Sequence, residues 1–221
     1  MASRGAAQLP MREGNYRSRQ SAAARGSKSR MLRIVGGAWR GRRFRFPAVE
    51  QIRPTPDRVR ETLFNWLGPD VQRARCLDLF AGSGALGLEA LSRGAAHATF
   101  VECAPVAARE LSARLQEWGA SSARVVQSDA SHFLRTARAS AEGPFDIAFL
   151  DPPFDGDLLS AAARLLEEGQ WLAPGALIYV EVPARQALPR LPEAWKALKA
   201  KQAGEVGYHL YKRGESGGAA I

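Results

Sequence analysis

The sequence predicts an α/β protein built on one mostly parallel, twisted sheet with helices on both faces. Beyond residue 73, short apolar runs alternate with amphipathic segments of about ten residues, and several of these segments stop at a glycine. A glycine-rich turn at residues 82–87 joins the first apolar run to the next amphipathic segment. With 221 residues, the chain is long enough for one such domain and a short appendage.

The elements before residue 73 are short and basic. Residues 31–49 contain small apolar pieces interrupted by glycines, which predicts a hairpin. A helix is predicted over about 56–67, because Thr55 can cap its N-terminus and Pro56 suits its first position.

The alternating region then predicts five strands and four helices. The strands are expected over 74–80, 97–101, 124–127, 145–150 and 176–182. The helices are expected over 85–93, 105–118, 130–139 and 158–168. Residues 195–201 suit a helix by composition, but together with 206–212 they favour an antiparallel hairpin across Ala203-Gly204.

The positive charge of the chain is concentrated at its N-terminus. The net charge is +9, and residues 1–60 hold 15 Lys and Arg against 3 Asp and Glu, whereas the remainder is slightly acidic. A basic arm on a nearly neutral domain is typical of a protein that binds a polyanion, although a solubilising tail would have the same composition. The arginines at 40, 42, 43 and 45 are crowded together and are the candidate RNA-binding residues.

Residues 1–30 have no hydrophobic period and are expected to be a disordered basic extension. Their Arg-rich, acid-poor composition also resembles a transit peptide, and a true start at Met31 is a third interpretation. No apolar stretch approaches the length of a membrane span. The spacing of the two cysteines, with three histidines, excludes a zinc cluster and favours reduced thiols in a cytoplasmic protein, so no metal is expected.

The glycine-rich turn follows Leu77-Asp78-Leu79-Phe80 and has Gly82, Gly84 and Gly87 in a G-x-G-x-x-G pattern, with Ser83 between the first two. This pattern indicates a nucleotide-like ligand at a strand–helix turn and is shared by nicotinamide-dependent enzymes. Asp78 separates the two classes, because a carboxylate would repel a pyrophosphate but would hold the ammonium group of S-adenosylmethionine. A turn-capping role for Asp78 is the alternative interpretation.

Two further acids follow predicted strands. Glu102 ends the second strand, where a carboxylate can accept both hydroxyls of a ribose in either cofactor class. Asp129 ends the third strand, where it could face an adenine amino group while the Ala130 N–H meets a ring nitrogen. Asp129 is equally suited to capping the helix that follows it.

The most specific motif is Asp151-Pro152-Pro153-Phe154, directly after a buried strand. The exocyclic amine of a base is a poor nucleophile, and two acceptors can hold its hydrogens so that the nitrogen becomes pyramidal. Asp151 and the Pro152 carbonyl supply that pair on a turn fixed by two prolines. Phe154 offers a face on which an extruded base could stack. These residues are therefore the candidate catalytic group.

Several of these segments together resemble the bacterial 16S ribosomal RNA guanine-N2-methyltransferase family that acts at guanine 966. The resemblance covers about residues 31–213 and rests on the segments 33–42, 53–66, 77–94, 151–154 and 205–212. It implies a Rossmann-like, S-adenosylmethionine-dependent methyltransferase fold with a seventh, antiparallel strand. It also implies a substrate in the small ribosomal subunit or its precursor, and it places Thr55 and Arg58 over the methionine end of the cofactor.

The resemblance divides the chain into a basic hairpin over 31–52, a methyltransferase domain over 53–213 and a flexible tail over 214–221, and we expect a monomer. Three alternatives remain open on the residues alone. A DNA adenine-N6 methyltransferase uses the same amine chemistry, but the chain lacks room for an inserted target-recognition domain. A nicotinamide-dependent oxidoreductase leaves Asp78 and Asp151 unexplained. A non-catalytic RNA-binding protein explains the basic arm alone.

Overall fold

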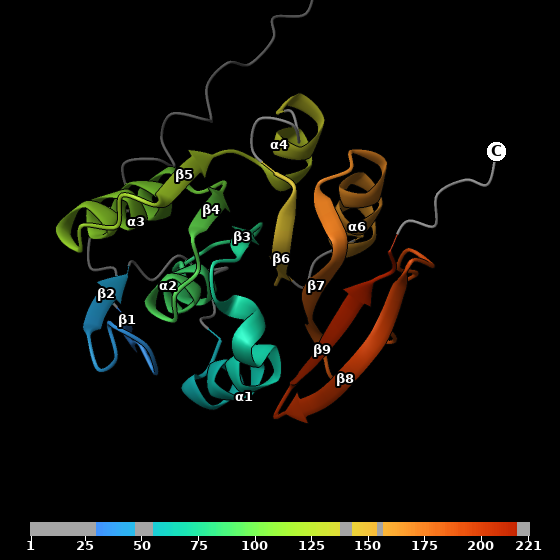
Figure 1. Ribbon diagram of the computed structural model, residues 1–221, viewed down its shortest axis with the longest axis horizontal. Helices are drawn as coiled ribbons and strands as arrows, with labels where there is room; N and C mark the ends of the chain where they lie inside the picture. Colours follow the sequence, from blue (N-terminus) through green and yellow to red (C-terminus); the bar gives the residue numbers. More distant parts are fainter. Residues whose placement is uncertain (1–29, 47–54, 138–142, 154–156, 216–221) are drawn as a thin grey trace, which may run out of the picture.

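The computed structural model describes residues 30–46, 55–137, 143–153 and 157–215 of the chain (Figure 1). The expectations for residues 1–29, for the C-terminal tail from 216 and for the stacking residue Phe154 lie outside these ranges. Within the described residues, no helix is long and apolar enough to cross a membrane.

A seven-stranded sheet forms the centre of the domain, in the order β5-β4-β3-β6-β7-β9-β8. Strand β9 pairs antiparallel with both β7 and β8, whereas the other pairings are parallel. The strands are β3 (Arg75–Asp78), β4 (His97–Glu102), β5 (Ala123–Gln127), β6 (Phe145–Leu150), β7 (Leu172–Pro183), β8 (Trp195–Ala203) and β9 (Val206–Arg213). The predicted fold class, with its single antiparallel strand, is confirmed.

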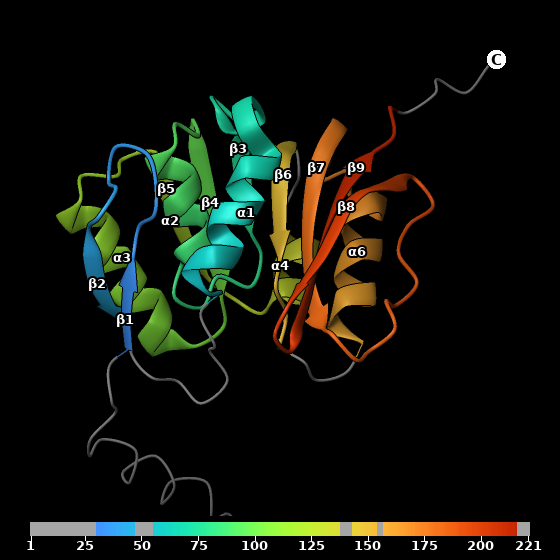
Figure 2. The same ribbon diagram turned by 90° about the horizontal axis from the view of Figure 1, so that it is seen from below.

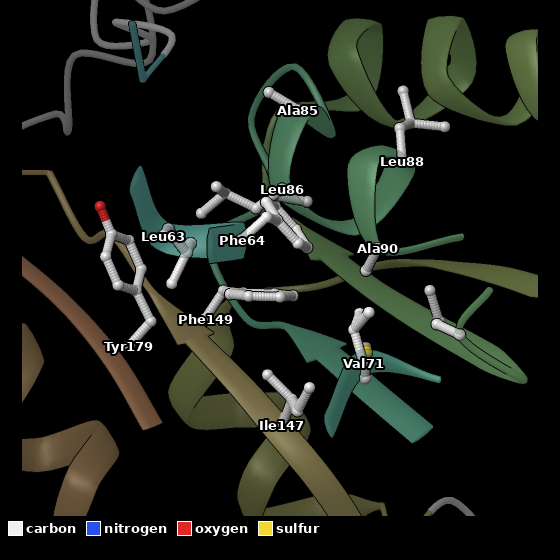
Figure 3. Close-up of a cluster of buried hydrophobic side chains, with 14 of the residues drawn as sticks. Leu63, Phe64, Val71, Ala85, Leu86, Leu88, Ala90, Ile147, Phe149 and Tyr179 are labelled. Atoms are coloured by element: carbon white, nitrogen blue, oxygen red, sulfur yellow. The ribbon is translucent and has the colours of Figure 1, made fainter. Parts of the chain in front are cut away.

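Helices cover both faces of this sheet. One apolar cluster joins the sheet to α1, α2 and α3, and a second joins the other face to α4 and α6. Figure 3 shows part of the first cluster, with Phe64 and Phe149 at its centre and Tyr179 at its edge. The helices are α1 (Asp57–Leu67), η1 (Gly68–Val71), α2 (Ala85–Ser92), α3 (Pro105–Glu117), α4 (Ala130–Thr136) and α6 (Leu158–Glu168).

The predicted strand and helix positions hold, but some bounds differ. Strand β3 ends at Asp78, before the predicted 80, because the backbone turns there into the glycine-rich loop. Strand β7 begins at Leu172, four residues early, since it pairs with β6 from Phe145 onward. The predicted hairpin across Ala203-Gly204 is confirmed, and the helical alternative for its first half is wrong.

The N-terminus of α1 differs from the prediction in an informative way. Pro56, not Thr55, occupies the cap position, and no side chain caps the helix. The Pro56 carbonyl instead accepts the first main-chain N–H groups of the helix, from Val59 and Arg60. The Thr55 hydroxyl points elsewhere and donates to a buried carboxylate of the sheet. Its side chain is therefore used at the site described below.

The basic hairpin forms from β1 (Arg30–Arg33) and β2 (Arg43–Phe46), so it begins one residue before the predicted start at 31. Figure 2 shows it beside α2 and α3, on the opposite side of the molecule from β8 and β9. Its inner side chains, Phe44 and Phe46, are buried, while Arg43 and Arg45 alternate with them and face outward. The alternation of the sequence thus decides which face of the hairpin stays exposed.

Candidate active site

The acidic residues predicted from the motifs lie at one edge of the sheet. Asp78 and Glu102 are the last residues of β3 and β4, and Asp151 directly follows β6. Strands β3, β4 and β6 are parallel neighbours, so their carboxyl ends meet at the same edge. The structure therefore brings these three carboxylates together, as the sequence predicts.

The glycine-rich loop connects β3 to α2 at this edge. Gly84 has a φ of +76° at the cap position of α2, a left-handed conformation that favours glycine. Gly87 is needed for space, because a Cβ there would lie 2.2 Å from the Phe100 ring on β4. Ser83 is buried, and Phe80 is partly exposed. The loop thus presents its backbone at the sheet edge, as a nucleotide-like ligand requires.

Asp78 is buried beneath this loop, and only 3% of its surface is exposed. Its Oδ2 accepts the Gly87 N–H at 3.0 Å, so the carboxylate ties the strand to the first turn of α2. Burial raises the pKa of Asp78 to about 7, the Gly87 N–H lowers it, and the charges of Glu102 and Glu181 raise it further. The turn-capping interpretation is therefore part of its role, and its contact with a cofactor stays a prediction.

Glu102 bonds two backbone amides of the surrounding loops. Its Oε2 accepts the Gly82 N–H at 2.7 Å and its Oε1 accepts the Ala104 N–H at 2.7 Å. The Cys103 thiol also donates to Oε1, at 3.7 Å, whereas Oε2 has a second lone pair that can accept a further donor. The hydrogen bonds from the two amide N–H groups fix the orientation of the Glu102 carboxylate before any ligand binds. The contact of Glu102 with a ribose stays a prediction.

Asp129 caps helix α4. Its Oδ1 accepts the His132 N–H at 3.0 Å, and the residue is exposed, while Ala130 behind it is buried. The capping interpretation left open by the sequence is thus observed. Oδ2 is not used by this bond, and the predicted contact of Asp129 with an adenine amino group stays a prediction.

Asp151 belongs to a chain of buried polar side chains. The Thr55 Oγ1 lies 3.5 Å from the Asp151 Oδ2 and donates to Glu181 Oε1 at 3.0 Å. The Tyr179 hydroxyl donates to the same Glu181 oxygen at 2.8 Å. Figure 3 shows the Tyr179 hydroxyl pointing away from the labelled apolar side chains. Thr55 thus joins a carboxylate of β6 to one of β7.

The two acids of this chain affect each other. Loss of water around Asp151 raises its pKa well above the ordinary value, the charges of Glu181 and Asp78 raise it further, and the Thr55 hydroxyl lowers it. Burial also raises the pKa of Glu181, while the hydroxyls of Tyr179 and Thr55 lower it. Among the described residues, the groups that lower the pKa values of Asp78, Asp151 and Glu181 are hydroxyls and one backbone amide, and none of them is a cation.

Glu181 and Tyr179 were not predicted by any motif. Both lie on β7 two positions apart, so they share the face of the sheet that packs against α1. The available signal was an acid inside the apolar run 176–182, which burial makes costly unless it has a role. Their connection to Asp151 depends on strand order, which the sequence does not contain explicitly.

The remaining predicted residues are placed as follows. Pro152 is buried directly after Asp151, and Arg58 is exposed on the first turn of α1. On the hairpin, the Arg42 guanidinium lies over the ring of Trp118, the residue directly after α3, 5.4 Å from the ring centre, and so helps to dock the hairpin. Arg40 is exposed, as are Arg43 and Arg45 on β2.

Comparison of the sequence with known families finds a match over residues 32–212 to the family described as "Conserved hypothetical protein 95". Ribosomal RNA small subunit methyltransferase D of Escherichia coli strain K12 is 50% identical over 191 residues, which cover 86% of this chain and 94% of the relative. The Haemophilus influenzae protein of the same name is 46% identical, over 82% of this chain and 93% of the relative.

Solved structures agree. The provisionally named methyltransferase yhhF of Escherichia coli superposes with a TM-score of 0.75 at 49% identity, over 84% of this chain and 99% of that chain. A Thermus thermophilus 16S rRNA N2 G1207 methyltransferase, solved with AdoMet and guanosine, has a TM-score of 0.58 at 24% identity, over 84% and 50% of the chains. That second likeness is evidence for the fold alone. The chain described here belongs to the ribosomal RNA small subunit methyltransferase D family.

Proposed function

We propose that this protein transfers a methyl group from S-adenosylmethionine to the exocyclic N2 of a guanine in small-subunit ribosomal RNA. The observation that carries the proposal is the position of Asp151 and Pro152, which follow β6 beside Asp78 at the carboxyl edge of the sheet. Membership in the family named above supports the RNA substrate. The choice of guanine N2 rests on the resemblance and on the amine chemistry of this turn.

The turn supplies two acceptors for an amino group. The Asp151 carboxylate and the Pro152 carbonyl can each take one N–H of an exocyclic amine, which favours a pyramidal nitrogen with an available lone pair. Pro152 is buried and fixes the backbone, so the acceptors are oriented before the base arrives. Asp151 acts here by holding and orienting the amine.

The residues of the sheet edge suit a cationic cofactor. Asp78 and Glu102 are buried carboxylates, and the groups that lower the pKa of Asp78 include no cation among the described residues. An ammonium group would compensate the Asp78 charge, and ribose hydroxyls would donate to Glu102. Bound there, S-adenosylmethionine supplies an electrophilic methyl group. Asp129, Ala130 and the loop at Gly82 would complete the adenine and backbone contacts.

The basic hairpin supports a nucleic-acid substrate. Arg40, Arg43 and Arg45 are exposed on one appendage of the domain, where they can meet phosphates without disturbing the sheet. Phosphate contacts position a polyanion but read no sequence, so they would orient the RNA while the Asp151 turn selects the amine.

The turn itself does not distinguish guanine from adenine, so a DNA adenine-N6 methyltransferase is the second candidate. The decisive experiment incubates the protein with methyl-labelled cofactor and one of three substrates: small ribosomal subunits lacking the mark, naked small-subunit RNA, or duplex DNA. Label in RNA, mapped by nucleoside mass spectrometry to N2-methylguanine, is the expected result. Label in DNA adenine alone would replace the proposal by the second candidate.

Asp151→Ala tests the acceptor role. We expect turnover to fall by about 100-fold or more, mainly in kcat, because the contact strengthens as the nitrogen becomes pyramidal. Cofactor affinity, measured by calorimetry, should be nearly unchanged. Asp70→Ala is the matched control, since Asp70 is an exposed acid at the opposite end of the strands. Near wild-type turnover of Asp151→Ala at saturating RNA and cofactor would show that the turn has a structural role only.

A further inference from the structure

We propose that Glu181 receives, through the Thr55 hydroxyl, the proton that Asp151 takes from the methylated amine. Glu181 is thus a positioning and proton-holding residue that acts through Asp151, without touching the base. The inference deepens the proposed function and rests on it for the source of the proton. The arrangement of Asp151, Thr55, Glu181 and Tyr179 can be tested in the free protein independently of any substrate.

The first argument is the geometry of the chain. Thr55 Oγ1 lies between Glu181 Oε1 at 3.0 Å and Asp151 Oδ2 at 3.5 Å. Thr55 and Glu181 are 5% and 3% exposed, whereas Asp151 is partly exposed at the sheet edge. Water therefore reaches the Asp151 end of the chain more easily than the Glu181 end. A proton at Glu181 is stored away from solvent.

The second argument is a count of hydrogens. A threonine hydroxyl has one hydrogen and can also accept, so it cannot donate to two carboxylates at once. With both acids ionised, one of the two contacts to Thr55 has no hydrogen in it. One proton on either acid completes both, because Thr55 then accepts from one carboxyl and donates to the other. Tyr179 donates to Glu181 in either state. The arrangement is thus matched to one shared proton.

The third argument is electrostatic. The groups that face Glu181 are the acids Asp151 and Asp78 and the hydroxyls of Tyr179 and Thr55, and Tyr208 lies opposite it on β9. Among the described residues, Arg60 of α1 contacts Thr55, and its Nε donates to the main-chain carbonyl of Thr55 at 3.2 Å and not to its hydroxyl. Burial raises the pKa of both acids of the pair, and the charge of Glu181 raises that of Asp151 further, which favours retention of one proton.

The proton step balances as follows. The amine nitrogen forms a bond to the methyl carbon, whose bond to sulfur breaks with its electron pair left on sulfur. The nitrogen, now positively charged, releases one proton to an Asp151 oxygen. Asp151 then donates to Thr55 Oγ1 while the hydrogen of Thr55 moves to Glu181 Oε1. The step starts with both acids ionised and ends with Asp151 as a carboxylate and Glu181 protonated. Before the next turnover, Glu181 returns this proton through Thr55 and Asp151 to water at the sheet edge.

The local sequence supports a use beyond packing. Thr55 precedes a helix whose cap it could fill, yet its hydroxyl is directed to Glu181. A neutral Gln at 181 would accept the same two hydroxyls without the cost of a buried charge. Hydrogen bonding to Thr55 and Tyr179 alone therefore does not require an ionisable residue at position 181.

The first test is made on the free protein. Infrared difference spectra across a pH titration report the protonated carboxyl groups, and Asp78→Asn is used as the background because Asp78 also keeps its proton to about pH 7. In this background the chain should still keep a protonated carboxyl to higher pH than an ordinary acid. In Glu181→Gln this band should be lost at lower pH, because Asp151 no longer repels a neighbouring charge. An unchanged titration would overturn the shared proton, whatever the enzyme does with RNA.

The second test is kinetic. Glu181→Gln should lower kcat by about tenfold to a hundredfold, within the range of proton-transfer effects, with little change in the KM for RNA. The acid limb of its pH–rate profile should move to lower pH. Thr55→Val should show a similar loss, Thr55→Ser should recover most of it, and the double variant Thr55→Val/Glu181→Gln should be little worse than either single change. Two results would overturn the proposed proton transfer from Asp151 through Thr55 to Glu181. One is a loss of kcat in the double variant equal to the sum of the two single losses, and the other is wild-type kcat in Glu181→Gln throughout the pH range.

The two tests separate this inference from the proposed function. If wild-type protein methylates no RNA but the infrared titration shows the shared proton, the substrate proposal fails and the pairing of the two acids stands. If RNA is methylated but Glu181→Gln keeps the wild-type titration and kcat, the relay fails alone. Calorimetric binding of S-adenosylmethionine to each variant controls for a damaged site.

Discussion

Two groups of buried carboxylates lie on the same face of the sheet, and they have opposite surroundings. Glu89 on α2 is fully buried and accepts four donors: the main-chain N–H groups of Val35 and Gly36, and the guanidinium groups of Arg60 and Arg93. Asp78 and Glu181 are also buried and Asp151 is partly buried, but these acids near the carboxyl edge of the sheet are stabilised by hydroxyls and one amide.

The difference separates anchoring from chemistry. Arginines compensate the charge of Glu89, which holds the loop after β1 against α2. The acids near the carboxyl edge of the sheet have no such compensation among the described residues that set their pKa values, so a cationic ligand or a proton must supply it. Within one domain, a buried carboxylate paired with arginines stabilises the fold, whereas one paired only with hydroxyls or an amide can bind a cationic ligand or a proton.

Replacing Glu89 with Gln should have the largest effect on stability. The amide keeps the shape but removes the buried anionic partner of Arg60, whose remaining ion-pair partner is the partly exposed Asp57, so we expect a loss of about 3–5 kcal/mol in the free energy of unfolding. Urea denaturation measures it. Glu117→Gln is the control, since that acid pairs with Arg114 at an exposed position. A loss below about 1 kcal/mol for Glu89→Gln would show that Glu89 does not stabilise the fold more than the acids at the carboxyl edge of the sheet do.

The same chemical change at Asp78 should act in the opposite direction. Its folded-state pKa of about 7 exceeds the ordinary 3.8, so the folded protein holds a proton that the unfolded chain has lost. The wild type is therefore destabilised as pH rises from about 4 through 7. Asp78→Asn removes this loss and keeps an oxygen for the Gly87 N–H.

We expect Asp78→Asn to gain up to about 4 kcal/mol at pH 8, since one pKa unit corresponds to about 1.4 kcal/mol, and almost nothing at pH 4. Thermal unfolding across this pH range measures the gain. Calorimetry should show weaker binding of S-adenosylmethionine to the same variant by about 1–3 kcal/mol. Equal destabilisation at both pH values would place Asp78 with Glu89 as a structural acid.

The hairpin that Glu89 anchors should matter for RNA and little for the sheet edge. Changing Arg43 and Arg45 to Gln should lower RNA affinity and reduce its log–log salt dependence by about one unit for each lost phosphate contact. Cofactor affinity and thermal stability should stay close to wild type, because both side chains are exposed. Arg164→Gln on α6 is the matched control. An unchanged salt dependence would show that the hairpin charge serves solubility alone.

The smallest effect is expected for an ion pair that is exposed to solvent and lies outside the candidate active site. Arg164 and Glu168 pair on α6 with both side chains more than half exposed. Arg164→Ala should change the free energy of unfolding by less than about 0.5 kcal/mol, and less still in high salt. A loss comparable to that of Glu89→Gln would mean that burial does not set the scale of these charges.

The sequence predicted the sheet and the positions of its terminal acids because both depend on local patterns. Apolar runs, stopping glycines and an acid after each strand identify the carboxyl edge without knowledge of strand order. The partners of those acids could not be predicted in the same way. Glu181 meets Asp151 through Thr55 only because β7 pairs with β6 and α1 begins above them.

The anchor of the hairpin was hidden for the same reason. Glu89 lies in the middle of the helix that follows the glycine-rich turn, where an acid ordinarily faces solvent. Arg93 is a local donor at i+4, but the donors from Val35, Gly36 and Arg60 come from two distant segments that pack against α2 only in the folded domain. The direction of the Thr55 hydroxyl was mispredicted because a helix cap is a local preference, and a buried carboxylate from a distant strand competed for the same hydrogen.

The position of β9 has a consequence for the order of events during synthesis. This strand is the last of the sheet in the chain but lies between β7 and β8, and it pairs Tyr208 opposite Glu181. Until it emerges, β7 keeps an open edge and Glu181 is not enclosed. A nascent chain can therefore form β3 and β4, which end in Asp78 and Glu102, early in synthesis. It encloses Glu181 only once residues 206–213 leave the ribosome.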